Sequence, residues 1–140
     1  MADNPVVDLL ADVRGLTGSE VAALWRVPAS GVPSVWMYSS EDRTKPVLDV
    51  KQQGIVCWAA QQAPGELSSH GDPVTFLATP VVECHGPCVL TVSSTKALGM
   101  SKEQYRRWLP RFAKQVGTLS DLVTVDQLSE RAERQTTILL

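Results

Sequence analysis

The residues best suited to chemistry in this sequence are its three cysteines and two histidines. Cys84, His85 and Cys88 stand together around a Gly-Pro pair, between two apolar runs rich in β-branched residues. With Cys57 they offer four soft ligands of the kind that zinc prefers. Against zinc, Cys84 and Cys88 are separated more widely than the usual two-residue ligand spacing, and residues on either side of a tight turn diverge. We therefore expect the segment to be a hairpin turn, and neither a zinc site nor a redox pair.

No other group of residues forms a catalytic constellation. The sequence lacks a phosphate-binding glycine loop, a nucleophile elbow, a paired-carboxylate pattern, and histidines with acids at metal-ligand spacing. We therefore expect a protein that is not an enzyme.

The composition is that of one soluble globular domain. The chain has 140 residues, of which 44% are hydrophobic and 20% charged, and its net charge is only -2. This balance gives no reason to expect binding to nucleic acid or to an anionic membrane. No apolar run approaches the roughly 20 residues that span a bilayer, and acids stand where a secretory signal carries bases. An odd number of cysteines also suits reduced thiols, so we expect a cytoplasmic location.

The elements that position these residues follow from the apolar pattern, beginning with a short amphipathic helix over residues 5–15. Asn4 is its expected N-cap, because Pro5 stands at the first helical position. Two antiparallel strands follow, the first ending near Val27 and the second starting near Ser34, with a loop of Pro and Gly between them.

A second helix, a hairpin and a long third helix complete the pattern. The second helix carries Ile55, Trp58 and Ala59 on one face and stops at Pro64. Residues 68–73 are expected to be a polar loop, and the two strands after it form a hairpin around Cys84–Cys88. The third helix is capped by Ser101, and Pro110 should kink or split it. The order of these elements predicts an α+β fold, with a central antiparallel sheet flanked by helices and a long C-terminal helix.

Several segments in this order resemble the GAF domain, the small-molecule sensor module of signalling proteins. They are AALWRV, SVWMYSSE, GIVCWAAQQ, FLATPVV and CVLTVSSTKALGMSKEQYRRWLPRFAKQVGTL, within residues 6–123. The shared features are a short helix opening at Gly54, a strand that runs from Phe-Leu to Pro-Val-Val, and a strand ending in Ser-Ser before a capped helix. The resemblance implies a GAF/PAS-like sheet between helical layers and a sensor domain at residues 1–123.

The resemblance also bears on cofactors. The NKFDE signature of cyclic-nucleotide-binding GAF domains is missing, which disfavours cAMP and cGMP. Some GAF photoreceptors attach a bilin through a Cys-His dipeptide on a helix, whereas Cys84-His85 lies in a predicted hairpin, so that role does not carry over. His70, six residues before Phe76, resembles the haem ligand of certain actinobacterial GAF sensors. A neutral imidazole suits a haem iron, but a solvated side chain is the commoner role of such a histidine, and a haem-binding redox or gas sensor stays open as an alternative.

A ligand pocket is expected between the sheet and the second helix. Aromatic residues alternate along the second strand, so that some of them face this pocket. Hydroxyls within apolar strands need partners, which a ligand can supply. The expected ligand-binding residues are Trp36, Tyr38, Trp58, His70, Phe76, Thr79, Thr91 and Ser93.

The C-terminal segment is expected to transmit a signal. Residues 124–140 are helix-prone and place Leu128, Ala132, Gln135 and Leu139 at coiled-coil spacing. In multi-domain GAF proteins such a helix runs into an output domain, here expected beyond residue 140, as in a histidine kinase. We also expect a homodimer, with an interface formed by Leu9, Val13, Trp108, Phe112 and Val116.

These features predict the regulatory sensor domain of a larger signal-transduction protein. A small molecule that binds one conformation better, by about 1 to 3 kcal/mol, would suffice to bias the terminal helices. The alternative is a ligand-free dimerisation or interaction domain whose pocket has closed. A cavity of roughly 300 Å³ or more favours sensing, whereas a sheet face filled by Trp36, Trp58 and Phe76 favours interaction.

Overall fold

The structure is a computed structural model that describes residues 4–82 and 86–139, with side chains as far as Leu122 apart from that of residue 102. It confirms the predicted order of elements and adds one short strand. The elements are α1 (Pro5–Thr17), β1 (Val21–Arg26), β2 (Ser34–Ser40), α2 (Val50–Ala60), β3 (Ser68–His70), β4 (Phe76–Val81), β5 (Cys88–Ser93) and α3 (Lys102–Leu139).

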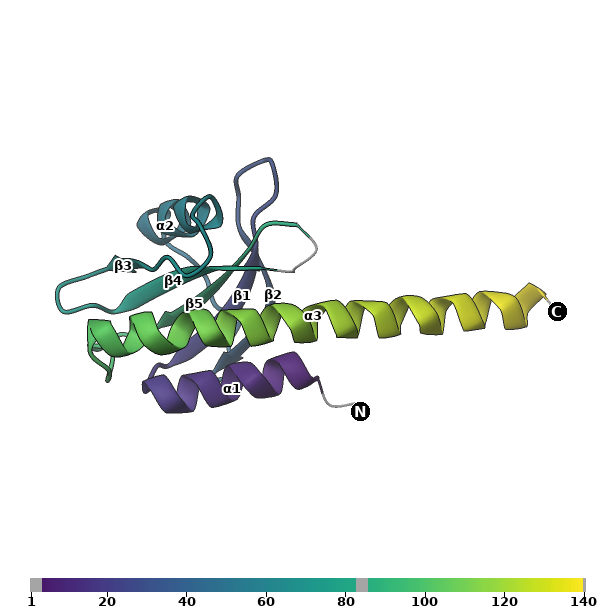
Figure 1. Ribbon diagram of the computed structural model, residues 1–140, viewed down its shortest axis with the longest axis horizontal. Helices are drawn as coiled ribbons and strands as arrows, with labels where there is room; N and C mark the ends of the chain where they lie inside the picture. Colours follow the sequence, from purple (N-terminus) through teal and green to yellow (C-terminus); the bar gives the residue numbers. More distant parts are fainter. Residues whose placement is uncertain (1–3, 83–85, 140) are drawn as a thin grey trace.

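The five strands form one antiparallel sheet in the order β2-β1-β5-β4-β3. Helices α1 and α3 lie side by side on one face of this sheet, and α2 covers the other face near the β3 edge (Figure 1). The predicted α+β architecture, with helical layers on both sides of an antiparallel sheet, is therefore confirmed. The predicted pairing of β4 with β5 is confirmed as well, while Cys84 and His85 lie outside the described residues.

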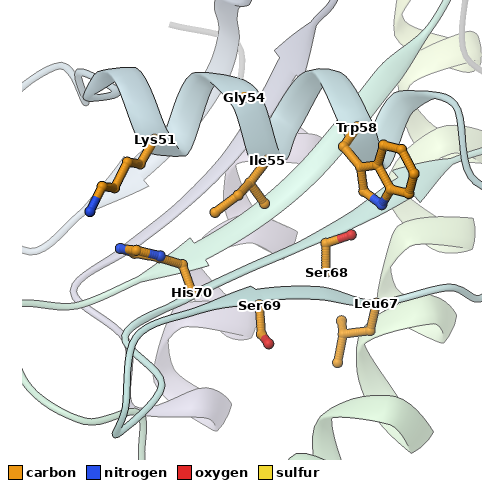
Figure 2. Close-up of a pocket in the computed structure, with 8 residues that line it drawn as sticks. All are labelled: Lys51, Gly54, Ile55, Trp58, Leu67, Ser68, Ser69 and His70. Carbon is orange, nitrogen blue, oxygen red and sulfur yellow. The ribbon is translucent and has the colours of Figure 1, made fainter.

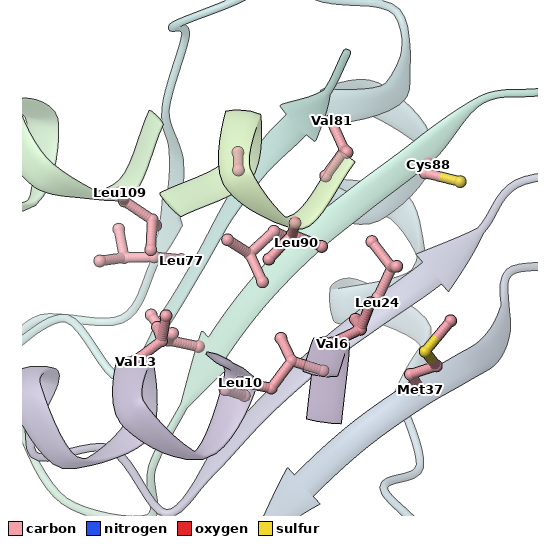
Figure 3. Close-up of a cluster of buried hydrophobic side chains, with 14 of the residues drawn as sticks. Val6, Leu10, Val13, Leu24, Met37, Leu77, Val81, Cys88, Leu90 and Leu109 are labelled. Atoms are coloured by element: carbon pink, nitrogen blue, oxygen red, sulfur yellow. The ribbon is translucent and has the colours of Figure 1, made fainter. Parts of the chain in front are cut away.

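The larger core lies between the sheet and the helices α1 and α3 (Figure 3). Side chains alternate along each strand, so every second residue of β1, β4 and β5 enters this core. Its buried members from the strands and helices include Val6, Leu10, Val13, Leu24, Leu77, Leu90, Leu109 and Val116.

A smaller core fills the space between the sheet and α2. It contains Trp25, Leu48, Val56, Ala59, Phe76 and Val89, all buried. The predicted helix is present, but Val56 and Ala59 face the sheet, whereas Ile55 is half-buried and Trp58 is 61% exposed. The spacing of apolar residues along a short helix does not determine which side of it packs against the sheet. In α2, the side with the smaller side chains packs there.

Local hydrogen bonds set where the helices begin, as predicted. The Asn4 side chain accepts from the backbone N–H of Val6 at 3.0 Å. Ser101 and Gln104 form a reciprocal capping box at the start of α3, with distances of 2.8 and 3.2 Å. The Tyr105 hydroxyl then donates to the carbonyl of Thr17 at 3.0 Å, which ties α3 to the end of α1.

The loop that leads into α3 is held by a carboxylate. Glu20 accepts from the backbone N–H of Thr95 at 3.0 Å and from its hydroxyl at 2.8 Å. These hydrogen bonds favour the charged carboxylate and hold the pKa of Glu20 below its usual value.

Helix α3 is continuous through Pro110, so the expectation that this proline splits the helix is wrong. A proline removes one backbone hydrogen bond, but the helix is packed against the sheet on both sides of it, through Leu109 and Ala113. The helix also runs without a break past residue 123 and extends well beyond the sheet (Figure 1). Within the described part of the chain, no helix combines the length and apolarity needed to cross a membrane.

At Gly117, α3 approaches the backbone at the end of β4 closely. A Cβ atom added there would overlap the Val82 carbonyl oxygen and lie 3.1 Å from a methyl group of Val81. The helix therefore rests directly on the end of β4, with no side chain between them.

Candidate functional site

A groove of about 570 Å³ lies between α2 and β3, at the edge of the sheet (Figure 2). It is open to solvent along its length. Its lining residues come from two short elements only: Lys51, Gly54, Ile55 and Trp58 from α2, and Leu67, Ser68, Ser69 and His70 from β3 and the residue before it.

Helix α2 contributes one face of the groove. Lys51, Ile55 and Trp58 are spaced four and three residues apart, so they share a side of the helix next to the one that buries Val56. A capping box at Asp49 fixes the start of the helix, because its carboxylate accepts from the N–H of Gln52 at 2.8 Å. Lys51 therefore lies in the first turn and Trp58 in the last.

Strand β3 contributes the opposite face through alternate residues. Ser68 and His70 pair with Ala78 and Phe76 of β4, and both of these partners belong to the core beneath α2. Side chains that are directly opposite in a ladder share a face, so Ser68 and His70 point towards α2, as Figure 2 shows.

The groove carries a local positive charge. Lys51 supplies an ammonium group, His70 an imidazole and Ser68 a hydroxyl, and none of the described residues that line the groove carries a carboxylate. Because the whole chain has a net charge of -2, this cationic character is local.

Two of the predicted ligand-binding residues, Trp58 and His70, lie on this groove. Others lie on the same side of the sheet but do not line it. Phe76 is buried in the smaller core and Tyr38 packs against it. The Thr91 hydroxyl accepts from the indole N–H of Trp25 at 2.8 Å, and Ser93 follows Thr91 two residues along β5 and is half-buried.

Trp36 and Thr79 lie away from the groove. A bulge between β1 and β2 places Trp36 against the larger core, with the Arg26 guanidinium 3.8 Å from the centre of its ring. Thr79 is fully buried and donates to the carbonyl of Glu66 at 2.9 Å. The expected pocket between the sheet and α2 is filled by the smaller core, and the open groove at the sheet edge takes its place.

The two cysteines within the described residues lie on opposite faces of the sheet. Cys57 is on α2, where its thiol donates to the carbonyl of Gly31 at 3.0 Å, while Cys88 is buried in the core beneath α1 and α3. These two residues therefore cannot share a metal ion. Cys84 and His85, the other members of the zinc set, lie outside the described residues.

The groove does not fit a haem bound through His70. A porphyrin needs an apolar cavity that encloses most of its surface. The groove is open, Lys51 and Ser68 contribute polar groups to it, and Phe76 and its neighbours fill the space behind it. No step of the function is assigned to haem.

Sequence reasoning missed Lys51 and Ser68 as members of the site. The signal for Lys51 was present, because it precedes Ile55 by four residues and Trp58 by seven on a predicted helix. No comparable signal exists for Ser68, since β3 has only three residues, all polar, within a segment that resembles a loop.

A second surface lies on the outer side of α1 and α3, where a groove of about 580 Å³ is lined by Leu9, Arg111, Lys114, Gln115, Thr118 and Leu119. Of the residues expected at a dimer interface, Leu9 lines this groove. Leu9 and Phe112 are half-buried against the larger core, and Trp108 is 43% exposed. The other two, Val13 and Val116, are fully buried against the sheet. Val13 and Val116 are therefore not part of an exposed interface.

Helix α3 carries two apolar stripes. The inner one faces the sheet through Tyr105, Leu109, Ala113 and Val116. The outer one follows the four-three spacing of a coiled coil and consists of Trp108, Phe112, Leu119 and Leu122, interrupted by the polar Gln115.

Comparison with solved structures identifies the fold. The GAF3 domain of Slr1393 from Synechocystis sp. PCC6803, in its photoproduct state, matches with a TM-score of 0.62 and 16% identity, over 91% of this chain and 96% of that one. A GAF domain region from Geobacter sulfurreducens PCA matches with a TM-score of 0.60 and 17% identity, over 84% and 91%. The blue-light absorbing PixJ GAF domain of Thermosynechococcus elongatus gives 0.59 and 12%, over 94% and 92%. No protein-family model and no curated protein matches the sequence. The chain therefore has the GAF fold.

Proposed function

We propose that this chain is a regulatory sensor domain that binds a small molecule in the groove between α2 and β3. The groove is the observation that carries the proposal, since its volume of about 570 Å³ suits a metabolite and its lining combines an exposed indole with two basic groups. The fold is consistent with this role, because PixJ, which has the same fold, is a cyanobacteriochrome receptor.

A conformational change at the groove would be transmitted through the sheet to α3. Strand β3 pairs only with β4 among the described strands, and the end of β4 supports α3 at Gly117. A ligand that draws β3 towards α2 therefore acts on the strand that carries the helix. A difference of about 1 to 3 kcal/mol in binding to two positions of β3 is enough to shift their populations.

The receiver would be a partner subunit or an output domain. The outer stripe of α3, with Leu9 of α1, forms an apolar surface that suits a homodimer. Residues 124–139 continue α3 and are proposed to form a linker towards an output domain of the two-component type, with residues 1–123 as the sensor in the cytoplasm.

Two exposed hydrophobic residues provide a matched test of ligand binding. Trp58 lies on the groove, while Val47 is 86% exposed and does not line it. A metabolite mixture should raise the melting temperature of the wild type and of Val47→Ala, but not that of Trp58→Ala. Native mass spectrometry of the freshly purified wild type identifies the bound compound. Equal shifts in both variants would refute the groove as the binding site.

One observation favours a second candidate, a ligand-free dimerisation domain. The face of the sheet beneath α2 is covered by the buried side chains of the smaller core. If this candidate is right, the purified chain is a dimer, retains no small molecule, and shows no thermal shift that depends on Trp58.

A further inference from the structure

We propose that the ligand of the groove is an elongated aromatic anion, with its ring on Trp58 and its acidic group between Lys51 and His70. This inference rests on the proposed function, because it names the chemical class of the ligand that the groove would sense. The groove has two unlike ends, which Figure 2 shows: Lys51 and His70 at one end and Trp58 at the other.

The Trp58 end suits a flat apolar group. The indole is 61% exposed, although α2 buries its neighbours Val56 and Ala59. An exposed aromatic ring beside Ile55 offers a stacking surface, and covering it with a second ring removes apolar area from water. A ligand ring seated there is enclosed by α2 on one side and β3 on the other.

The opposite end suits an anion. Among the described residues, neither Lys51 nor His70 has a side-chain hydrogen bond or an ion pair, and no carboxylate lines the groove. Their nitrogen atoms, which lie at the same end of the groove in Figure 2, are available to a carboxylate or a phosphate. A cationic ligand would be repelled by Lys51, and a neutral ligand would gain no charge-assisted hydrogen bond from its ammonium group.

The spacing of the two ends sets the shape of the ligand. Lys51 and Trp58 are seven residues apart on α2, which corresponds to about 10 Å along the helix axis. A compact anion reaches only one end, and a bare ring only the other. A ring joined to its acidic group by a chain or a second ring spans both.

The test uses matched compounds on the full chain. The probes are 6-phenylhexanoate, its neutral amide 6-phenylhexanamide, hexanoate without the ring, and 6-phenylhexyl phosphate. Titration calorimetry should give tighter binding of the phenyl acid than of its amide or of hexanoate, by about five- to tenfold in Kd. Comparing 6-phenylhexyl phosphate with 6-phenylhexanoate shows which acidic group the groove prefers. Tight binding of either compound supports the proposal.

Two pairs of variants assign the ends. Lys51→Gln should abolish the preference for the acid over the amide, whereas Lys45→Gln, outside the groove, should leave it unchanged. Trp58→Ala should weaken binding of the phenyl compounds and not of hexanoate, with Val47→Ala, outside the groove, as its control. Both groove residues are exposed, so the variants should fold, and urea unfolding of each verifies this.

Two outcomes separate this inference from the proposed function. If the amide binds as well as the acid and both depend on Trp58, the groove is a ligand site but the anionic class is refuted. If no probe binds in a manner that depends on Trp58 or Lys51, and native mass spectrometry finds no bound compound, both proposals fail.

Discussion

Thr91 shows at the scale of a single residue why a hydroxyl in a strand is an ambiguous signal. Its position in an apolar strand predicts a polar partner, and a ligand is one such partner. In the structure the partner is the indole N–H of Trp25, which is itself buried. The requirement for a partner was predictable, but its identity depends on the pairing of β1 with β5, which no local pattern reveals.

This hydrogen bond leads to a prediction about stability. Thr91→Val keeps the shape of the side chain but leaves the Trp25 N–H buried without an acceptor, so the free energy of unfolding should fall by about 1–3 kcal/mol. Urea unfolding measures this change. Adding Trp25→Phe to Thr91→Val should cost less than the sum of the two single changes, because both partners are then absent. Additive costs would contradict the assigned hydrogen bond.

At the scale of the elements, local signals predicted the helices better than the shortest strand. Asn4 and Ser101 were recognisable as caps because capping depends on neighbours three residues away. Strand β3 was not recognisable, since three polar residues carry no alternation and are held only by pairing with β4. The side of α2 that faces the sheet was also unpredictable, because it depends on packing against residues distant in the sequence.

The contact between α3 and β4 leads to a prediction in which the same change has opposite effects at two glycines. Gly117→Ala should destabilise the fold by about 1–3 kcal/mol, because the new methyl group overlaps the Val82 carbonyl. Gly15→Ala, in α1, has no atom within 4 Å of the added Cβ, and should stabilise the fold by about 0.5–1 kcal/mol. Thermal unfolding of the two variants makes the comparison, and stabilisation by both would contradict the close approach.

At the scale of the whole molecule, the sequence predicted the layers and the antiparallel pairing but not the position of the site. Apolar periodicity and the order of the segments were enough to predict the layers and the antiparallel pairing. The groove at the sheet edge arises because Trp25 and Phe76 fill the space under α2 and leave only its outer side open. Such a result of packing requires all of the elements together.

The outer surface of α1 and α3 predicts a dimer. Leu119→Glu should place a charge in the apolar groove beside Leu9 and raise the dimer dissociation constant at least about tenfold. Val47→Glu is the control, since Val47 is 86% exposed and lies outside this groove. Light scattering over a range of concentrations measures both variants, and a wild type that stays monomeric at high concentration would contradict the prediction.

The contact at Gly117 has a mechanical consequence for the long helix. Backbone meets backbone there, so the contact cannot be compressed and serves as a fulcrum. Helix α3 extends about 22 Å from Gly117 to Lys102 and about 33 Å from Gly117 to Leu139, at 1.5 Å per residue. A tilt that moves the near end by a given amount therefore moves the far end about one and a half times as far, in the opposite direction.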